Sequence, residues 1–231
     1  MTPSHRRHIH LRALSRQGKG CTVGCDYVGT VLQVGHRVTK DFKPGDRIAG
    51  FTHGVNAVEK EDGCFAEYAA VKGDVQCKVP DNVSDEEAST LGVGITTVGQ
   101  SLYQSLGLPF PGSGKSSEPL LIYGGSTATG SLAIQFALLS GCQVITTCSP
   151  RNFAFVKALG AVEAFDYHDS DCASKIREYT NDTLTRVLDC ISDSESAKIS
   201  SEAISSQGGQ VSYLLAPKHD RTDVENKVRC D

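Results

Sequence analysis

A glycine-rich turn holds the residues of this 231-residue chain that are best suited to bind a phosphate. Residues 123–130 read Tyr-Gly-Gly-Ser-Thr-Ala-Thr-Gly. Glycine lets a backbone approach a phosphate closely, and a helix that begins at such a turn offers N–H groups without partners. Ser126, Thr127 and Thr129 add hydroxyl donors. The turn predicts a phosphate site, although its spacing differs from the G-x-G-x-x-G fingerprint, and the alternative is an ordinary strand-to-helix connection.

A second polar segment, residues 147–152, reads Thr-Cys-Ser-Pro-Arg-Asn and indicates which dinucleotide would bind. A site for NAD usually carries Asp or Glu about twenty residues beyond the glycine turn, to accept from the ribose 2′-hydroxyl. This segment has no acid and one cation, Arg151. Ser149, Arg151 and Asn152 could hold a 2′-phosphate through charge-assisted hydrogen bonds. We therefore expect NADPH in preference to NADH; the alternative for Arg151 is a solvated residue at a helix start.

Two other interpretations of these motifs carry different chemistry. Residues 114–116 resemble the end of a P-loop, but Pro109 stands where its first glycine belongs, and the segment precedes a strand instead of following one. We reject a P-loop. Residues 124–128 also resemble a nucleophile elbow whose last glycine is replaced by Ala128. A hydrolase stays open at this point, because the chain holds histidines and acids further on: His168, His219, Asp166 and Asp189.

The elements that must position these segments alternate regularly in the second half of the chain. Apolar runs predict strands at residues 119–123, 143–147, 163–167, 186–190 and 210–215. Amphipathic runs predict helices at residues 129–140, 152–159, 171–179 and 195–206. This alternation is typical of an α/β fold with a doubly wound parallel sheet, the Rossmann fold. Such a sheet ordinarily has a sixth strand, but only a polar tail, residues 217–231, follows, so we expect the last strand to be lacking.

The first half of the chain shows a different pattern of predicted secondary structure. Short β-rich runs at residues 28–34, 47–51 and 64–71 are separated by turns, and the boundary between the halves falls between residues 80 and 91. The predicted organisation is an irregular segment at residues 1–20, a β-rich domain at residues 21–90 and a nucleotide-binding domain at residues 91–231.

Composition excludes several classes of function. The net charge of −4 gives no basic excess for nucleic acid, and no apolar run approaches the roughly 18 to 20 residues that span a membrane. Nine scattered cysteines in a chain of this length fit a reducing compartment, and we expect a cytoplasmic protein. The chain has no CxxC pair and no HExxH motif, so no metal site is expected.

The β-rich region begins with a set of spaced residues: Gly24, Cys25, Asp26, Gly29, Gly35 and Val38. Their spacing resembles the signature GHE-x2-G-x5-G-x2-V of the zinc alcohol dehydrogenases, which belong to the medium-chain dehydrogenase/reductase superfamily. Cys25 replaces the zinc-ligand histidine, and Asp26 replaces the glutamate. The chain thus resembles a zinc-free branch.

Within that branch, residues 23–30, 91–100, 124–129 and 148–152 resemble the fungal trans-acting enoyl reductases, which partner polyketide synthases that lack a working reductase domain. The resemblance runs from about residue 20 to residue 215. It implies a partial GroES-like substrate domain followed by a Rossmann domain. The reaction implied is hydride transfer from NADPH to the β-carbon of an α,β-unsaturated thioester, followed by protonation at the α-carbon.

The resemblance also implies roles for individual residues. Cofactor contacts are expected at Ser126, Thr127, Ala128, Thr129, Ser149, Pro150, Arg151, Asn152, Tyr167, Leu214 and Leu215. Substrate contacts are expected at Leu91, Gly92, Val93, Gly94, Ile95, Thr96, Thr97 and Val98. Thr97 is the one candidate for a catalytic residue.

Departures from the family leave alternatives open. The family's N-terminal cofactor segment resembles NPTDWKH, whereas residues 2–8 here read Thr-Pro-Ser-His-Arg-Arg-His, and we expect a chain truncated at both ends. The alternatives are a zinc-free quinone-type oxidoreductase and a truncated, non-catalytic fragment or accessory partner of a polyketide synthase. The expected assembly is a monomer or homodimer.

Overall fold

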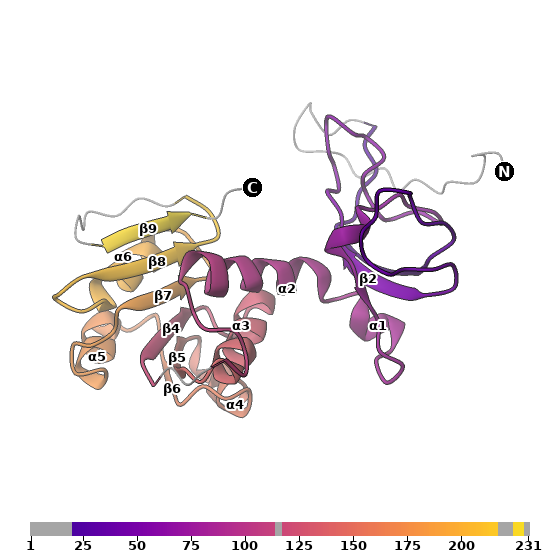
Figure 1. The fold of residues 1–231 in the computed structure, drawn as a ribbon. Helices are drawn as coiled ribbons and strands as arrows, with labels where there is room; N and C mark the ends of the chain where they lie inside the picture. The colour runs from indigo at the N-terminus through magenta and orange to yellow at the C-terminus, as the bar shows by residue number, and fades with distance from the viewer. Residues whose placement is uncertain (1–19, 114–116, 217–223, 229–231) are drawn as a thin grey trace. The chain divides into compact units, whose positions relative to one another are not determined.

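The computed structural model describes residues 20–113, 117–216 and 224–228, with side chains up to residue 225 (Figure 1). The chain forms two compact units, the first ending at Gly94 and the second beginning at Ile95. This division lies a few residues beyond the range 80–91 expected from the sequence. The predicted irregular segment, residues 1–20, falls outside the described residues except for Gly20.

The first unit is built on a small antiparallel sheet in the order β1-β2-β3. Its strands are β1 (Asp26–Thr30), β2 (Arg47–Phe51) and β3 (Cys77–Lys78). A short 3-10 turn, η2 (Gly73–Val75), precedes β3, and helix α1 (Asp85–Ala88) follows it. The core beside this sheet is small, with Ala49, Val79 and Ala88 buried against one another. Of the strands predicted here, residues 47–51 are confirmed, and the strand predicted at 28–34 ends at Thr30.

The strand predicted at residues 64–71 is wrong. The backbone N–H groups of Cys64 and Phe65 donate to the carbonyl oxygens of Gly24 and Val23, at 3.1 and 2.9 Å. Beyond Phe65 the chain bends, and Tyr68 is 60% exposed. The prediction was based on the apolar composition of the segment. A strand also needs a neighbouring strand to pair with its backbone N–H and C=O groups. No strand among the described residues pairs with this segment.

The second unit contains a six-stranded sheet, parallel throughout, in the order β6-β5-β4-β7-β8-β9 (Figure 1). The strands are β4 (Pro119–Tyr123), β5 (Gln143–Thr147), β6 (Glu163–Phe165), β7 (Arg186–Asp189), β8 (Gly209–Tyr213) and β9 (Val224–Val228). The five strands predicted in this half are confirmed to within two residues at either end. This is the doubly wound arrangement, in which the strand order reverses between β4 and β7.

The prediction that the last strand is lacking is wrong, because β9 pairs in parallel with β8 from Gly209 opposite Val224 to Tyr213 opposite Val228. The sequence of this segment resembles a polar tail, because Glu225, Asn226 and Lys227 interrupt its apolar pattern. Strands at the edge of a sheet commonly carry charged and polar residues, so their hydrophobic signal is weak.

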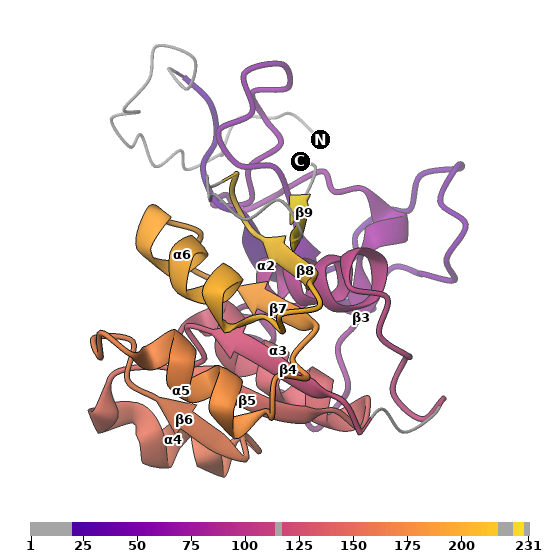
Figure 2. The same ribbon diagram turned by 90° about the vertical axis from the view of Figure 1, so that its left-hand side faces the viewer.

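Helices cover both faces of this sheet. They are α2 (Gly92–Gly99) with the π-helical turn η3 (Gln100–Ser105), α3 (Ala128–Leu139), the 3-10 turn η4 (Pro150–Asn152), α4 (Phe153–Ala158), α5 (Cys172–Tyr179) and α6 (Ser194–Ala203). Leu120 and Ile122 face the core formed with α3, α4 and η3. Leu121 faces the opposite core, formed with α5 and α6, which lie side by side (Figure 2).

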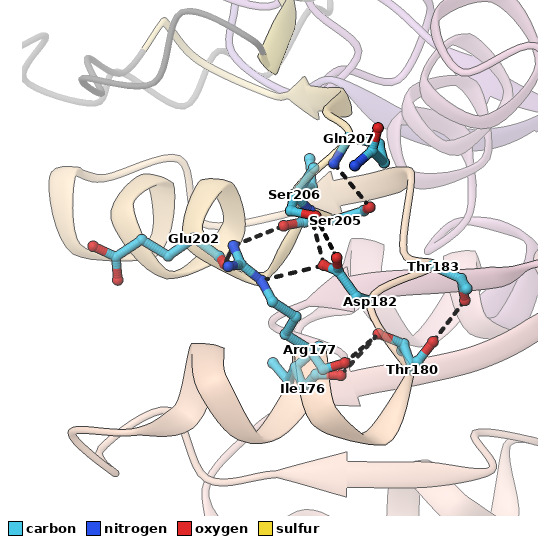
Figure 3. Close-up of polar contacts among 10 residues, drawn as sticks. Ile176, Arg177, Thr180, Asp182, Thr183, Glu202, Ser205, Ser206 and Gln207 are labelled. Atoms are coloured by element: carbon cyan, nitrogen blue, oxygen red, sulfur yellow. Dashed lines mark hydrogen bonds and ion pairs between the residues drawn. The ribbon is translucent and has the colours of Figure 1, made fainter.

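The last turn of α5 and the loop that follows it hold the end of α6 (Figure 3). The guanidinium of Arg177 donates to the carbonyl oxygen of Glu202 and, at 2.8 Å, to that of Ile204. Asp182, in the left-handed region at φ +57°, accepts from the backbone N–H of Ser206 at 2.8 Å. Cations stabilise the carbonyl groups at a helix C-terminus, so Arg177 serves as a cap for α6.

Replacing Arg177 with alanine is expected to lower the free energy of unfolding by about 1.5 to 3 kcal/mol, since it removes charge-assisted hydrogen bonds to two carbonyl groups. Urea denaturation would measure the change. Lys198→Ala is the matched control, because Lys198 is an exposed cation on α6, and its loss should change stability by less than about 0.5 kcal/mol. Equal effects of the two substitutions would contradict a capping role for Arg177.

Candidate functional site

The residues predicted to bind a cofactor come together at one edge of the parallel sheet. Residues 126–129 follow β4, residues 149–152 follow β5, Tyr167 lies just after β6, and residues 214–215 follow β8. All of these segments stand at the carboxyl ends of their strands. In open α/β sheets ligands bind at this edge, where the strand order reverses, and here the reversal lies between β4 and β7.

The glycines of the turn after β4 are required by close packing. Gly124 has φ +81°, a conformation that favours glycine. A Cβ atom on Gly125 would lie 2.0 Å from Oγ1 of Thr146, and one on Gly130 would lie 2.3 Å from the carbonyl oxygen of Gly124. The turn is therefore pressed against β5 and against the first turn of α3.

Thr147, at the end of β5, holds the same turn through hydrogen bonds. The N–H of Gly124 donates to Oγ1 of Thr147 at 3.0 Å. The N–H of Gly125 donates to the carbonyl oxygen of Thr147, also at 3.0 Å. These bonds hold the glycine backbone in place before any ligand binds, so the site is preorganised.

Thr127 caps helix α3. Its Oγ1 accepts from the N–H of Gly130 at 3.0 Å and donates to the carbonyl oxygen of Gly124 at 2.8 Å. The hydroxyl hydrogen predicted for a phosphate is thus used within the protein. Among the described residues, the N–H groups of Ala128 and Thr129 and the hydroxyls of Ser126 and Thr129 have no hydrogen-bond partner, which leaves them available to an anion.

The end of β5 presents one unpaired cation. Pro150 and Arg151 are exposed in η4, and Arg151 forms no ion pair within the described part of the chain. Oγ of Ser149 lies 3.4 Å from the hydroxyl of Tyr167, which joins the loops after β5 and β6. The nearby surface therefore combines a free guanidinium with hydroxyl groups, a combination suited to a phosphate.

Asp166, the acid that follows β6, is already hydrogen-bonded within the protein. Asp166 accepts from the backbone N–H of His168 at 3.0 Å and contacts its Nδ1 at 2.7 Å, and this bonding lowers the pKa of the carboxyl group. The His168 ring packs on Tyr167 with centroids 4.0 Å apart. No hydrogen bond joins His168 to Ser126 in the described structure, and His219 lies outside it, so a Ser-His-Asp hydrolase gains no support.

A buried acid at the end of β7 organises the other side of the strand reversal. Oδ1 of Asp189 accepts from the backbone N–H groups of Ile191 and Ser192, each at 2.9 Å, and Oδ2 accepts from Oγ of Ser200 at 3.3 Å. Burial raises the pKa of this carboxyl group. From the sequence, the only role predicted for Asp189 is that of an acid in a hydrolase. Its structural role could have been predicted from its position, because an acid that directly ends an apolar strand lies at the carboxyl edge of the sheet.

Two cysteines lie at this edge, Cys148 buried and Cys190 partly buried. Burial raises the pKa of Cys148 to about 11, with a smaller contribution from Asp166, and it also raises the pKa of Cys190. The thiolate is the reactive form of cysteine. Neither residue is therefore suited to act as a nucleophile at neutral pH.

The residues predicted to contact substrate lie along the first turns of α2. Oδ1 of Asp26 accepts from the backbone N–H of Val93 at 2.5 Å, and a Cβ atom on Gly92 would lie 2.0 Å from the carbonyl oxygen of Gly50. Asp26, which replaces a glutamate of the zinc enzymes, thus anchors the start of this helix. Thr97 is only 3% exposed, whereas Ile95 is exposed. A catalytic role for Thr97 stays a prediction.

The described residues contain no group of three or more His, Cys, Asp or Glu side chains that could hold a metal ion. None of their helices has the length and apolar character needed to span a bilayer.

Comparison with known families covers both units. The family described as alcohol dehydrogenase GroES-like domain matches residues 4–81, and the family described as zinc-binding dehydrogenase matches residues 128–227. Among solved structures, an alcohol dehydrogenase superfamily protein from Novosphingobium aromaticivorans is 25% identical with a TM-score of 0.77, over 90% of this chain and 61% of that one. The fold is thus that of the medium-chain dehydrogenases, a GroES-like unit followed by a Rossmann unit.

Curated relatives narrow the assignment. The chain is 51% identical to the trans-enoyl reductase TOXD of Cochliobolus carbonum over 98% of its own length and 75% of the relative's. It is 48% identical to the trans-enoyl reductase ACTTS2 of Alternaria alternata over 89% of this chain and 61% of that one. The chain belongs to the family of fungal trans-enoyl reductases. It spans 75% of the length of the first of these relatives and 61% of the second.

Proposed function

We propose that this chain is the NADPH-binding part of a trans-enoyl reductase that reduces an α,β-unsaturated polyketide thioester in fungal secondary metabolism. The observation that carries the proposal is the edge of the Rossmann sheet, where a preorganised glycine turn adjoins a strand end that has no acid and one unpaired arginine. Relatives named trans-enoyl reductases at 48 to 51% identity favour this activity over quinone reduction.

Different segments at this edge of the sheet would bind different parts of the cofactor. The glycine turn, with the N–H groups of Ala128 and Thr129, would receive the pyrophosphate. Ser149, Arg151 and Asn152 would hold the 2′-phosphate, and Pro150 shapes the loop that carries them. Residues Tyr167, Leu214 and Leu215 would flank the rest of the cofactor. NADPH supplies the hydride when it is bound; the protein supplies its position.

The substrate side of the proposal rests on residues 91–98. Asp26 and the close packing of Gly92 fix the start of α2, and the residues of this segment would contact an acyl chain. Ile95 is its exposed apolar residue. A polyketide synthase would be the partner that delivers the substrate, tethered as a thioester to its carrier domain.

Thermal denaturation of the purified chain, titrated in parallel with NADPH and NADH, tests the proposal. A ligand that binds only the folded state raises the midpoint, by an amount that corresponds to about 2.7 kcal/mol of added stability at one hundred times its Kd. We expect a saturable rise with NADPH and a smaller one with NADH at equal concentration. No rise with either cofactor would overturn the proposal.

Arg151→Ala is expected to weaken NADPH binding about 10- to 100-fold, because a hydrogen bond to a charged group contributes about 1.5 to 3 kcal/mol. NADH lacks the 2′-phosphate, so its Kd should change less than about twofold on the same argument. Isothermal titration would give both values. Arg186→Ala, which removes a cation paired with Glu118 at the amino end of β7, is the control for total charge. Equal weakening of both cofactors by Arg151→Ala would contradict recognition of the 2′-phosphate.

A further inference from the structure

The turn that follows β7, residues 190–193, contains a serine in an unfavourable backbone conformation. Ser192 has φ +61°, in the left-handed region where residues with a Cβ are strained, and it is only 7% exposed. Its backbone N–H donates to Oδ1 of Asp189 at 2.9 Å. A residue held in such a conformation in a buried turn is constrained by its surroundings and often serves a function.

The side chain of Ser192 joins the ends of two strands. Its Oγ donates to the carbonyl oxygen of Asp189, the last residue of β7, at 3.1 Å. The same oxygen accepts from the backbone N–H of Leu214, the first residue after β8, at 2.9 Å. One hydroxyl group thus bridges the carboxyl ends of β7 and β8.

Leu214 depends on this bridge because it lies beyond the ladders of the sheet. The pairing of β8 with β7 ends at Tyr213 opposite Asp189, and the pairing of β8 with β9 ends at Tyr213 opposite Val228. The backbone of Leu214 is therefore held toward β7 by the hydroxyl of Ser192 instead of by strand pairing.

The path of a dinucleotide across the sheet brings it to this point. If the 2′-phosphate lies at the end of β5 and the pyrophosphate lies at the turn after β4, the remaining half must continue in the same direction. The strand order places β7 and then β8 next. Dinucleotides span the point of strand reversal, so the nicotinamide half would lie over the ends of β7 and β8.

We propose that Ser192 is a positioning residue for the nicotinamide half of the cofactor, acting through the backbone of Leu214. This inference rests on the proposed function, since it assumes a dinucleotide at this edge of the sheet. Ser192 does not need to touch the cofactor. Its hydroxyl sets where the segment after β8 stands, and that segment forms the wall against which the nicotinamide ribose and ring would rest.

The test compares two variants with two probes. Ser192→Ala removes the hydroxyl and keeps the Cβ, whereas Ser192→Gly removes the hydroxyl and relieves the strain at φ +61°. The probes are NADPH and adenosine 2′,5′-bisphosphate, which lacks the nicotinamide half. For both variants we expect NADPH to bind about three- to tenfold more weakly, the range that corresponds to one lost hydrogen bond. Binding of the bisphosphate should change less than about twofold on the same basis.

Asn181→Gly is the matched control, because Asn181 is another non-glycine residue in the left-handed region, at φ +50°, and it lies before the amino end of β7. It should leave the Kd of both probes unchanged. An effect of Ser192→Gly that is absent in Ser192→Ala would assign the change to backbone freedom and overturn the inference. So would equal weakening of the two probes, or no change in either. Failure of the unmodified chain to bind NADPH would instead overturn the proposed function.

Discussion

Gly130→Ala is expected to lower the free energy of unfolding by about 2 to 3 kcal/mol and to abolish measurable NADPH binding. Helix propensity alone predicts the opposite, since alanine is favoured over glycine inside a helix by about 1 kcal/mol. The steric effect should prevail, because the new Cβ would lie 2.3 Å from the carbonyl oxygen of Gly124 and 2.8 Å from the Cα of Gly125. Both are backbone atoms, so α3 must move away from the phosphate-binding turn. Urea denaturation and an NADPH titration would measure the two effects.

Gly99→Ala is the control for this substitution. Gly99 ends α2 with helical backbone angles, and no heavy atom lies within 4 Å of the position that its Cβ would take. Here propensity acts without a clash, and the variant should be more stable by about 0.5 to 1 kcal/mol. If Gly130→Ala proved as stable as Gly99→Ala, the close packing of α3 against the turn would be incorrect.

Asp189→Ala is expected to destabilise the chain by about 2 to 4 kcal/mol, because it leaves the buried N–H of Ser192 and the partly buried N–H of Ile191 without their acceptor. Asp189→Asn retains an oxygen at the same position and should recover most of this loss. Urea denaturation at neutral pH would compare the three proteins. Similar stability of the alanine and asparagine variants would contradict the role of Oδ1 as the acceptor.

The same carboxyl group gives a pH signature. Burial raises the pKa of Asp189 above its usual value of 3.8, so the folded state retains the proton to higher pH than the unfolded state does. Its contribution to stability is therefore present at low pH and is lost as pH rises through the folded pKa. The stability of the unmodified chain relative to Asp189→Asn should fall as pH increases from about 4 toward neutrality.

The sequence predicted the elements whose signal is local. Strands β4 and β5 are short apolar runs between clear turn residues, and both begin and end where they were expected. Strand β9 was missed because its stability comes from pairing with β8 and not from its own composition. The error at residues 64–71 has the opposite origin, since an apolar run there has no strand to pair with among the described residues.

The site was predictable to a similar extent. The spacing of glycines and hydroxyl residues in the turn after β4 indicated a phosphate site, and the structure places that turn at the strand reversal. The capping role of Thr127 depends on the geometry of α3, and the bridge from Ser192 to Leu214 joins residues 22 positions apart. Such bonds arise only after the sheet has formed, so no pattern of neighbouring residues indicates them.

The buried cysteines give the chain internal reporters of its own unfolding. In the first unit, burial raises the pKa of Cys64. In the second unit, burial raises the pKa of Cys148 to about 11 and that of Cys172 to about 11. An unfolded thiol has a pKa of about 8.5 and reacts far more readily with an alkylating reagent. Each modification therefore records an opening of the unit that holds the cysteine. Mass spectrometry of alkylated peptides can time the opening of the two units separately, without any added label.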